Sequence, residues 1–163
     1  MSQVVLESIR HLLDAAGVRY DEAAHRAVRT AEEAARARGC SVEIGAKSIV
    51  LKTDDTFRLF VLSGADSLRS RLIRQRLGVR RTRFASPEEL AHLTGLEPGA
   101  VPPFGPPVLP LELSVDPGLL THERIAFTPG VNTVSIIMSS VDYRRLAHPE
   151  VFPFSRESQE NSR

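Results

Sequence analysis

Residues 95–110 read GLEPGAVPPFGPPVLP, and this stretch decides whether the chain forms one domain or two. It contains six of the chain's eleven prolines. Proline fixes φ and removes a backbone donor, so the segment cannot be a helix or a central strand. Strand and helix patterns continue on both sides of it, and neither flank has a self-sufficient pattern. We therefore interpret the segment as a rigid loop inside a single domain rather than a linker.

The sequence around this loop predicts alternating helices and strands. Apolar residues at helical spacing, together with capping motifs, predict helices over residues 5–16, 30–39, 67–77, 86–95 and 139–146. Runs of β-branched residues predict strands over residues 44–53, 58–63, 79–85, 109–115, 125–127 and 133–138, and residues 18–25 add a strand and a turn. We expect one domain over residues 1–154 and a polar, disordered tail over residues 155–163.

Composition places the 163-residue chain among ordinary soluble globular proteins, with 42% apolar residues and a net charge of +1. It has no apolar run long enough to span a bilayer and no signal-peptide pattern, so we expect a cytoplasmic protein that does not bind membranes. The single cysteine, Cys40, excludes an internal disulfide. Five histidines without ligand spacing predict no metal site. Cys40 could act as a nucleophile with His25 as its base, but a structural thiol is favoured.

Positive charge is concentrated in one segment. Residues 69–83 read RSRLIRQRLGVRRTR, with seven arginines and no acidic residue. Arginine matches phosphate oxygens bidentately, so the segment could bind an RNA backbone. A solvated helix face in an arginine-rich sequence is an equally good interpretation.

The two lysines of the chain lie in one predicted strand, IGAKSIVLKT over residues 44–53. Strand side chains alternate between faces, so Lys47 shares a face with Ile49 and Leu51, whereas Lys52 points the other way. A lysine on an apolar face either extends its ammonium to solvent or directs it into a pocket.

The proline-rich loop offers backbone amides rather than reactive side chains. Gly99, Ala100 and Val101 could together form an anion-binding concavity, because glycine lets the backbone approach a ligand closely. Pro102 and Pro103 have no N–H to contribute. The same pattern also describes a plain turn.

Six short motifs follow one another along residues 4–146: His25 after Tyr20, Thr30-x-x-Glu-Ala-Ala, Ala46-Lys47-Ser48, Leu77-Gly78-Val79, Thr94-Gly95 and Gly99-x-x-x-Pro103-Phe-Gly. In this order they resemble the YbaK/ProX family of aminoacyl-tRNA deacylases, the prolyl-tRNA synthetase editing-domain superfamily. The resemblance implies a single mixed α/β domain with a curved, barrel-like mixed sheet flanked by helices. It also implies hydrolysis of the ester that joins a wrong amino acid to tRNA, most often proline tRNA carrying alanine, cysteine or serine.

The resemblance further implies how the ester is held. Lys47 and the amides of Gly99, Ala100 and Val101 would position it, with help from a ribose hydroxyl of the substrate and without a side-chain nucleophile, metal or cofactor. We expect the substrate pocket to include His25, Thr30, Ile49, Leu51, Thr94, Pro102, Pro103, Phe104 and Asn132. His25 could instead cap a turn, Thr30 could cap a helix, and Phe104 could pack in the core.

The expected partners are the acceptor end of tRNA, held by Arg69, Arg71, Arg74, Arg76, Arg80 and Arg81, and prolyl-tRNA synthetase. The protein itself is expected to be a monomer or weak dimer. Two positions depart from the family: Gly105-Pro-Pro-Val replaces a basic segment, and Thr128 stands where alanine-specific members often carry histidine. The alternative is a module on the same fold that binds tRNA or a synthetase without catalysis.

Overall fold

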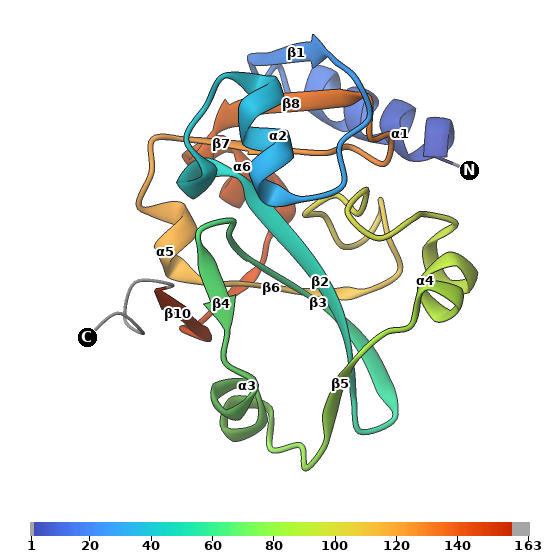
Figure 1. Cartoon of the computed structure of the whole chain (residues 1–163), viewed down its shortest axis with the longest axis vertical. Coiled ribbons are helices and arrows are strands. Elements are labelled where there is room, and N and C mark those ends of the chain that lie inside the picture. Colours follow the sequence, from blue (N-terminus) through green and yellow to red (C-terminus); the bar gives the residue numbers. More distant parts are fainter. Residues whose placement is uncertain (1, 158–163) are drawn as a thin grey trace.

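The computed structural model describes residues 2–157, and a long β-hairpin runs through its centre (Figure 1). The hairpin consists of β2 (Ala46–Thr53) and β3 (Thr56–Ser63), which pair antiparallel along their whole length. The turn at Asp54-Asp55 allows this pairing, and Asp54 adopts a positive φ of 53° there. The hairpin therefore provides the rigid frame on which the rest of the molecule is assembled.

Within residues 2–157 the strands form three sheets, and the hairpin is the centre of the largest. The five-stranded sheet has the order β5-β2-β3-β6-β9, and its other strands are β5 (Thr82–Phe84), β6 (Glu112–Val115) and β9 (Glu150–Val151). A three-stranded antiparallel sheet of order β1-β8-β7 contains β1 (Tyr20–Ala24), β8 (Val134–Ser139) and β7 (Arg124–Phe127). The third sheet pairs β4 (Asp66–Leu68) with β10 (Ser155–Glu157). The mixed α/β prediction is confirmed, but within residues 2–157 the strands do not close into a barrel.

The β4–β10 pair also changes two expected boundaries. Residues 66–68 form a strand, so the helix expected from residue 67 begins only at Ser70. Residues 155–157 extend the folded domain beyond the expected boundary at residue 154. The remainder of the expected tail, residues 158–163, lies outside the described residues.

Helices cover the sheets, and the two side-chain caps that the sequence predicts, Thr30 and Ser86, are present. The helices are α1 (Ser2–Ala15), α2 (Ala31–Arg38), a 3-10 turn at Val42–Ile44, α3 (Ser70–Leu77), α4 (Pro87–Thr94), α5 (Pro117–Leu120) and α6 (Ser140–Ala147). Thr30 caps α2 by accepting the Glu33 amide at 3.1 Å, and Ser86 forms a capping box with Glu89 on α4. None of the helices within residues 2–157 is long and apolar enough to span a bilayer.

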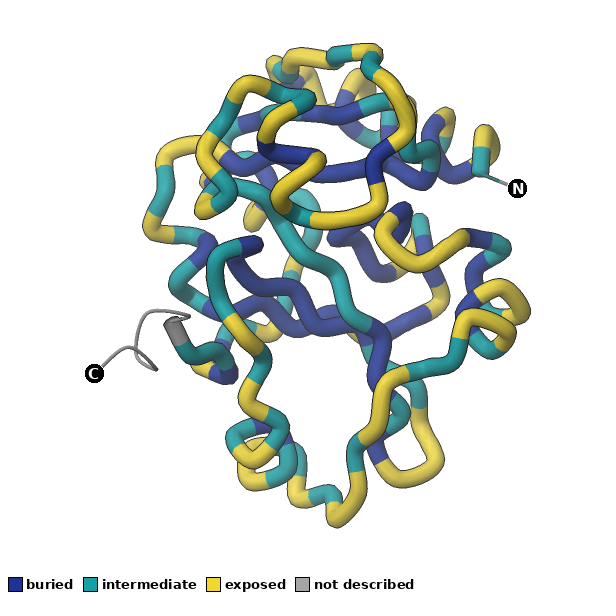
Figure 2. The backbone as a smooth tube through the Cα atoms, viewed as in Figure 1, coloured by how far each residue is buried: buried dark blue, intermediate teal, exposed yellow. Residues whose placement is uncertain are grey.

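The two faces of the hairpin bury two separate hydrophobic clusters. The larger contains Val50, Leu59 and Val61 from one face of the hairpin, together with residues of α1, α6 and the three-stranded sheet. The smaller contains Leu51, Phe60 and Leu62 from the other face, with Ile73 of α3 and Phe152 and Phe154 near the C-terminus. Figure 2 shows β3 buried along the centre of the molecule, whereas exposed residues are common in the outer helices.

Candidate active site

A gap in strand pairing along β2 defines the candidate site. β5 covers this edge of β2 only from Leu51 to Thr53, and Gly45 forms a single parallel bridge with Ala126 of β7. Between these two contacts, no described strand pairs with the edge, and Ala46, Lys47 and Ser48 there line a cavity of about 280 Å³. The cavity is closed by the start of α2, Gly64, Thr128 and the loop that contains Gly99 and Val101. The segments that meet here are far apart in the sequence.

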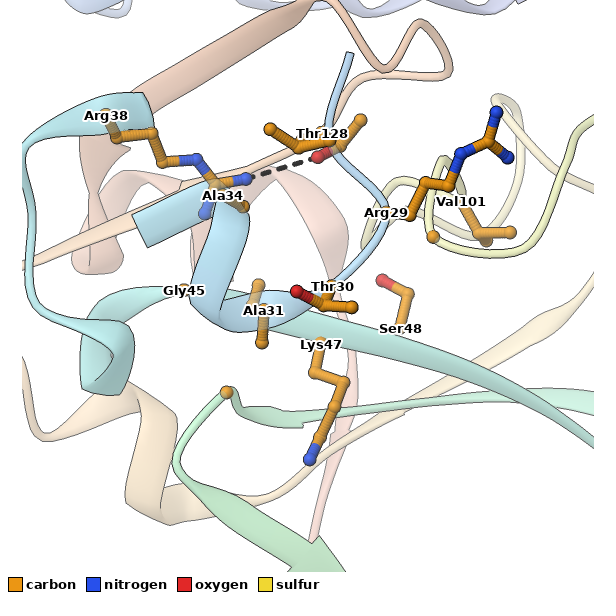
Figure 3. Close-up of a pocket in the computed structure, with 14 residues that line it drawn as sticks. Arg29, Thr30, Ala31, Ala34, Arg38, Gly45, Lys47, Ser48, Val101 and Thr128 are labelled. Atoms are coloured by element: carbon orange, nitrogen blue, oxygen red, sulfur yellow. Dashed lines mark hydrogen bonds between the residues drawn. The ribbon is translucent and has the colours of Figure 1, made fainter. Parts of the chain in front are cut away.

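Lys47 lies at the base of this cavity. It sits opposite Leu62 of β3 and is half-buried, and its ammonium donates a hydrogen bond to the backbone carbonyl of Asp66. Burial lowers the pKa of Lys47 from its ordinary value. The side chain therefore does not simply extend into solvent. Figure 3 shows it pointing to the opposite side of the cavity from Arg38 and Thr128.

The proline-rich loop reaches the cavity through Gly99 and Val101. Gly99 has a φ of +86°, and a Cβ at this position would lie 2.9 Å from the Arg29 carbonyl oxygen. Glycine is therefore required for both the backbone conformation and the close approach. The Ala100 amide donates to the Glu97 carbonyl at 3.1 Å, and Ala100 does not line the cavity. Of the three residues whose amides were predicted to bind a ligand, Gly99 and Val101 line the cavity, whereas the Ala100 amide is engaged within the loop.

The rest of this loop is anchored in the hydrophobic core. Phe104 is buried and makes edge-to-face contacts with Phe127 and Tyr143, at centroid distances of 5.5 and 5.3 Å. The Tyr143 hydroxyl donates to the Pro103 carbonyl at 2.5 Å. Burial raises the pKa of Tyr143, so the phenol stays protonated and remains a donor. Pro102, Pro103 and Phe104 are buried without lining the cavity, so the core interpretation of Phe104 is the one that the structure supports.

α2 presents its small residues to the cavity. Ala31, Ala34 and Arg38 are spaced by three and four residues, lie on one helix face and line the cavity together with Thr30. Thr30 is therefore both the helix cap and a lining residue. The alanine methyl groups leave room that larger side chains would fill. Arg38 ends the helix and extends its guanidinium over this space (Figure 3).

A polar network holds the Arg38 guanidinium. Its Nε donates to Ser135 Oγ at 2.8 Å, and its Nη2 donates to Thr128 Oγ1 at 3.2 Å. His25 Nε2 lies 2.8 Å from the same Ser135 oxygen. Burial lowers the pKa of Arg38 to about 10. His25 thus borders the site through Ser135 and does not line the cavity itself. The sequence analysis did not select Arg38.

Ser48 is a second residue that the sequence analysis did not select. It lines the cavity on the side of Arg29 and Val101 (Figure 3), opposite to Lys47, as expected for neighbours on a strand. Its hydroxyl oxygen is buried and has no hydrogen-bond partner among residues 2–157. A bound ligand could supply that partner.

Four further predicted substrate-binding residues, besides His25, Pro102, Pro103 and Phe104, lie away from the cavity lining. Leu51 belongs to the smaller hydrophobic cluster and Ile49 packs against it. Thr94 is buried, donates to the Leu90 carbonyl at 2.7 Å and accepts the Leu96 amide at 3.1 Å, so it caps the end of α4. Asn132 accepts the Val28 amide through its backbone carbonyl. The first three have clear structural roles.

The arginine-rich segment forms a surface away from the cavity, because α3 lies at the lower end of the molecule and α2 in its upper half in Figure 1. Arg74 is half-buried and donates to Ser70 and Thr82. Arg76 contacts Glu150 at 3.4 Å and lies over the Phe152 ring. The other predicted tRNA-binding arginines are exposed: Arg69, Arg71, Arg80 and Arg81.

The lining of the cavity is positively charged. Arg29, Arg38 and Lys47 are among its lining residues, and none of the lining residues is acidic. Such a site favours carbonyl, hydroxyl or phosphate oxygens as ligands. Within residues 2–157, no group of three or more His, Cys, Asp or Glu side chains is arranged to hold a metal ion.

Comparisons with known proteins identify relatives that act on aminoacyl-tRNA. The model of the aminoacyl-tRNA editing domain matches residues 25–146. The chain is 32% identical, over 96% of its length and 99% of the relative, to the multifunctional Ser/Thr-tRNA deacylase ProXp-y of Escherichia coli K12. It is 35% identical to part of the proline–tRNA ligase of Shouchella clausii, over 60% of this chain and 17% of the ligase. A crystal structure of a proposed trans-editing enzyme for prolyl tRNA synthetase superimposes with a TM-score of 0.79 at 27% identity, covering 93% of this chain and 97% of that one.

Proposed function

The chain belongs to the aminoacyl-tRNA editing-domain family, whose members are hydrolases, and we propose that it removes a small non-cognate amino acid from tRNA in trans. Proline tRNA carrying serine, alanine or cysteine is the first candidate substrate. The similarity to a free-standing deacylase over nearly both full lengths supports action in trans. The partial similarity to proline–tRNA ligases supports proline tRNA as the acceptor and prolyl-tRNA synthetase as a neighbour.

One observation carries this proposal: a single small cavity gathers Lys47, the Gly99 loop and the first turn of α2. A volume of about 280 Å³ suits an aminoacyl group and its ester linkage better than a whole nucleotide. The ester would lie between the ammonium and the loop, with the tRNA outside. In this arrangement the cavity walls would limit which water molecules reach the ester bond.

The reaction adds water to the ester carbonyl carbon. The new C–O bond makes a tetrahedral oxyanion, and its collapse breaks the bond to the ribose oxygen, which takes a proton and leaves as the tRNA hydroxyl. In our proposal the amides of Gly99 and Val101 stabilise the oxyanion. The Lys47 ammonium, which exchanges the Asp66 carbonyl for the substrate, holds the ester from the opposite side of the cavity. A neighbouring ribose hydroxyl orients the water. Fixed donors of this kind need no reorganisation, and removing one typically costs about 10²–10³ in rate.

The decisive experiment measures deacylation of proline tRNA charged separately with serine, alanine, cysteine and proline. Wild type is compared with Lys47→Ala and with Lys52→Ala as a matched control, since the Lys52 ammonium lies over the Phe57 ring. We expect wild type and Lys52→Ala to remove a non-cognate amino acid from the tRNA and to leave prolyl-tRNA intact. The deacylation rate of Lys47→Ala should be at least about 100-fold lower. Absence of clearing by wild type, with tRNA still bound, would instead identify a binding module.

We further propose that the exposed arginines of α3 and of the segment just before β5, such as Arg71 and Arg81, bind the phosphates of the tRNA. Affinity should then be insensitive to sequence and should weaken steeply with salt. Charge reversal at Arg71 or Arg81 should raise KM more than it lowers kcat, and should flatten the salt dependence. Arg145→Glu, on α6, is the control, since its guanidinium pairs with Asp142 of the same helix.

A further inference from the structure

The cavity contains a cation that no acidic side chain neutralises. Among the described residues, Arg38 has no carboxylate within ion-pair distance; its two protein partners are the neutral hydroxyls of Ser135 and Thr128. Half-burying a guanidinium without a counterion has an electrostatic cost, as the lowered pKa reflects. Such an arrangement is better explained by a ligand than by stability.

The directions of the hydrogen bonds fix which donors remain free. His25 Nδ1 lies 2.8 Å from the Arg26 carbonyl, which can only accept, so Nδ1 carries the proton. In the neutral ring, Nε2 therefore accepts the hydroxyl proton of Ser135, whose oxygen in turn accepts from Arg38 Nε. His25 and Ser135 thus hold the guanidinium in one orientation.

Two donors are left at this end of the cavity. Arg38 Nη1 has no partner within residues 2–157 and lies near Gly45, where an added Cβ would approach it to 3.2 Å. Thr128 Oγ1 accepts from Arg38, so its own hydroxyl hydrogen is free to donate. A methyl group placed here would satisfy neither donor, whereas an oxygen atom can accept a hydrogen bond from a guanidinium N–H or from a hydroxyl.

We infer that Arg38 and Thr128 select the amino acid to be removed, by binding a side-chain hydroxyl oxygen as in serine or threonine. This inference rests on the proposed deacylase function. A phosphate of the tRNA is the less suitable ligand for Arg38, because the exposed Arg29 lies at the cavity and is better placed for a group that arrives from solvent. Alanine differs from serine by the one oxygen that these donors would bind.

The test compares kcat/KM for proline tRNA carrying serine with kcat/KM for the same tRNA carrying alanine. The ratio is measured for wild type, Arg38→Leu, Arg38→Lys and Thr128→Val, with Arg36→Leu as control, since Arg36 is exposed on the same helix. Because both substrates meet the same preparation, a loss of folded protein cancels from the ratio. We expect wild type to favour serine, Arg38→Leu to lower the ratio about 10- to 100-fold and Thr128→Val to lower it less. Arg38→Lys should keep part of the preference, and Arg36→Leu should not change it.

Each other outcome has a definite meaning. If Arg38→Leu slows both substrates equally, Arg38 acts on the tRNA or on the fold, and the specificity role is wrong although the deacylase function stands. If wild type favours alanine, the specificity role is also wrong. If wild type clears neither charge, the proposed function fails and the inference fails with it.

Discussion

The hydrogen bond from Tyr143 to the proline-rich loop allows the sharpest test of how the fold shapes the site. Replacing Tyr143 with phenylalanine removes one oxygen and keeps the ring, so the contact with Phe104 at 5.3 Å is preserved. The buried Pro103 carbonyl then loses its only side-chain donor within residues 2–157. An unsatisfied buried acceptor costs about 1–3 kcal/mol.

The chain contains its own control, because it has only two tyrosines. The hydroxyl of Tyr20 donates to Asp14 at 3.1 Å on the surface, where water can replace it. We expect Tyr20→Phe to change the free energy of unfolding by no more than about 0.5 kcal/mol. The same chemical deletion thus separates a buried donor from an exposed one.

Urea unfolding gives the free energy, and thermal unfolding should show a fall of about 2–4 °C in Tm for each kcal/mol lost. Deacylation at a temperature where both variants are folded should be slower for Tyr143→Phe, chiefly in kcat, because Pro103 follows the loop residues that line the cavity. Equal unfolding free energies for the two variants would refute the claim that this hydrogen bond holds the loop.

Three further predictions follow from the geometry. Gly99→Ala should lower the free energy of unfolding by more than Gly78→Ala and should also slow deacylation. Both glycines have a positive φ, but an added Cβ would meet the Arg29 backbone at Gly99 and nothing within 4 Å at Gly78. Unfolding and activity measurements on the two variants test this. The rate of deacylation, after subtraction of uncatalysed ester hydrolysis, should fall as pH rises through a pKa below 10.5, because burial lowers the pKa of Lys47 and deprotonation removes its charge; a rate that is flat up to pH 10.5 would contradict this role. Asp116→Ala should cost about 2–4 kcal/mol in urea unfolding, because its carboxylate accepts three backbone amides, including that of Phe154 at 2.8 Å; an effect under 1 kcal/mol would show that water replaces the carboxylate.

Local signals in the sequence predicted much of the secondary structure. The caps at Thr30 and Ser86, the turn at Asp54-Asp55 and the alternation along β2 depend on neighbouring residues, and the structure confirms them. The strand at residues 66–68 was missed because its partner is the polar segment 155–157, and no local pattern indicates a pairing across that separation.

For the candidate site as well, the sequence predicted the features that depend on neighbouring residues and missed those that depend on the tertiary structure. The shared face of Lys47, Ile49 and Leu51 was predicted, but the sequence could not show that the cavity lies beside the strand edge rather than over that apolar face. Arg38 was missed because a basic residue at the end of a helix has an ordinary interpretation as a partner of the helix dipole. Its spacing from Ala31 and Ala34 was the available signal, since two small residues on one helix face leave a space that a long side chain can enter.

The interrupted pairing along β2 also leaves a strand edge that needs protection against aggregation. An uncovered strand edge is a template to which a neighbouring chain can add a strand. Here the uncovered segment is flanked by α2 on one side and by the proline-rich loop on the other, so the opening admits only a small guest. The same two elements that line the cavity would therefore also protect the strand edge, leaving it accessible to a small ligand and closed to another polypeptide.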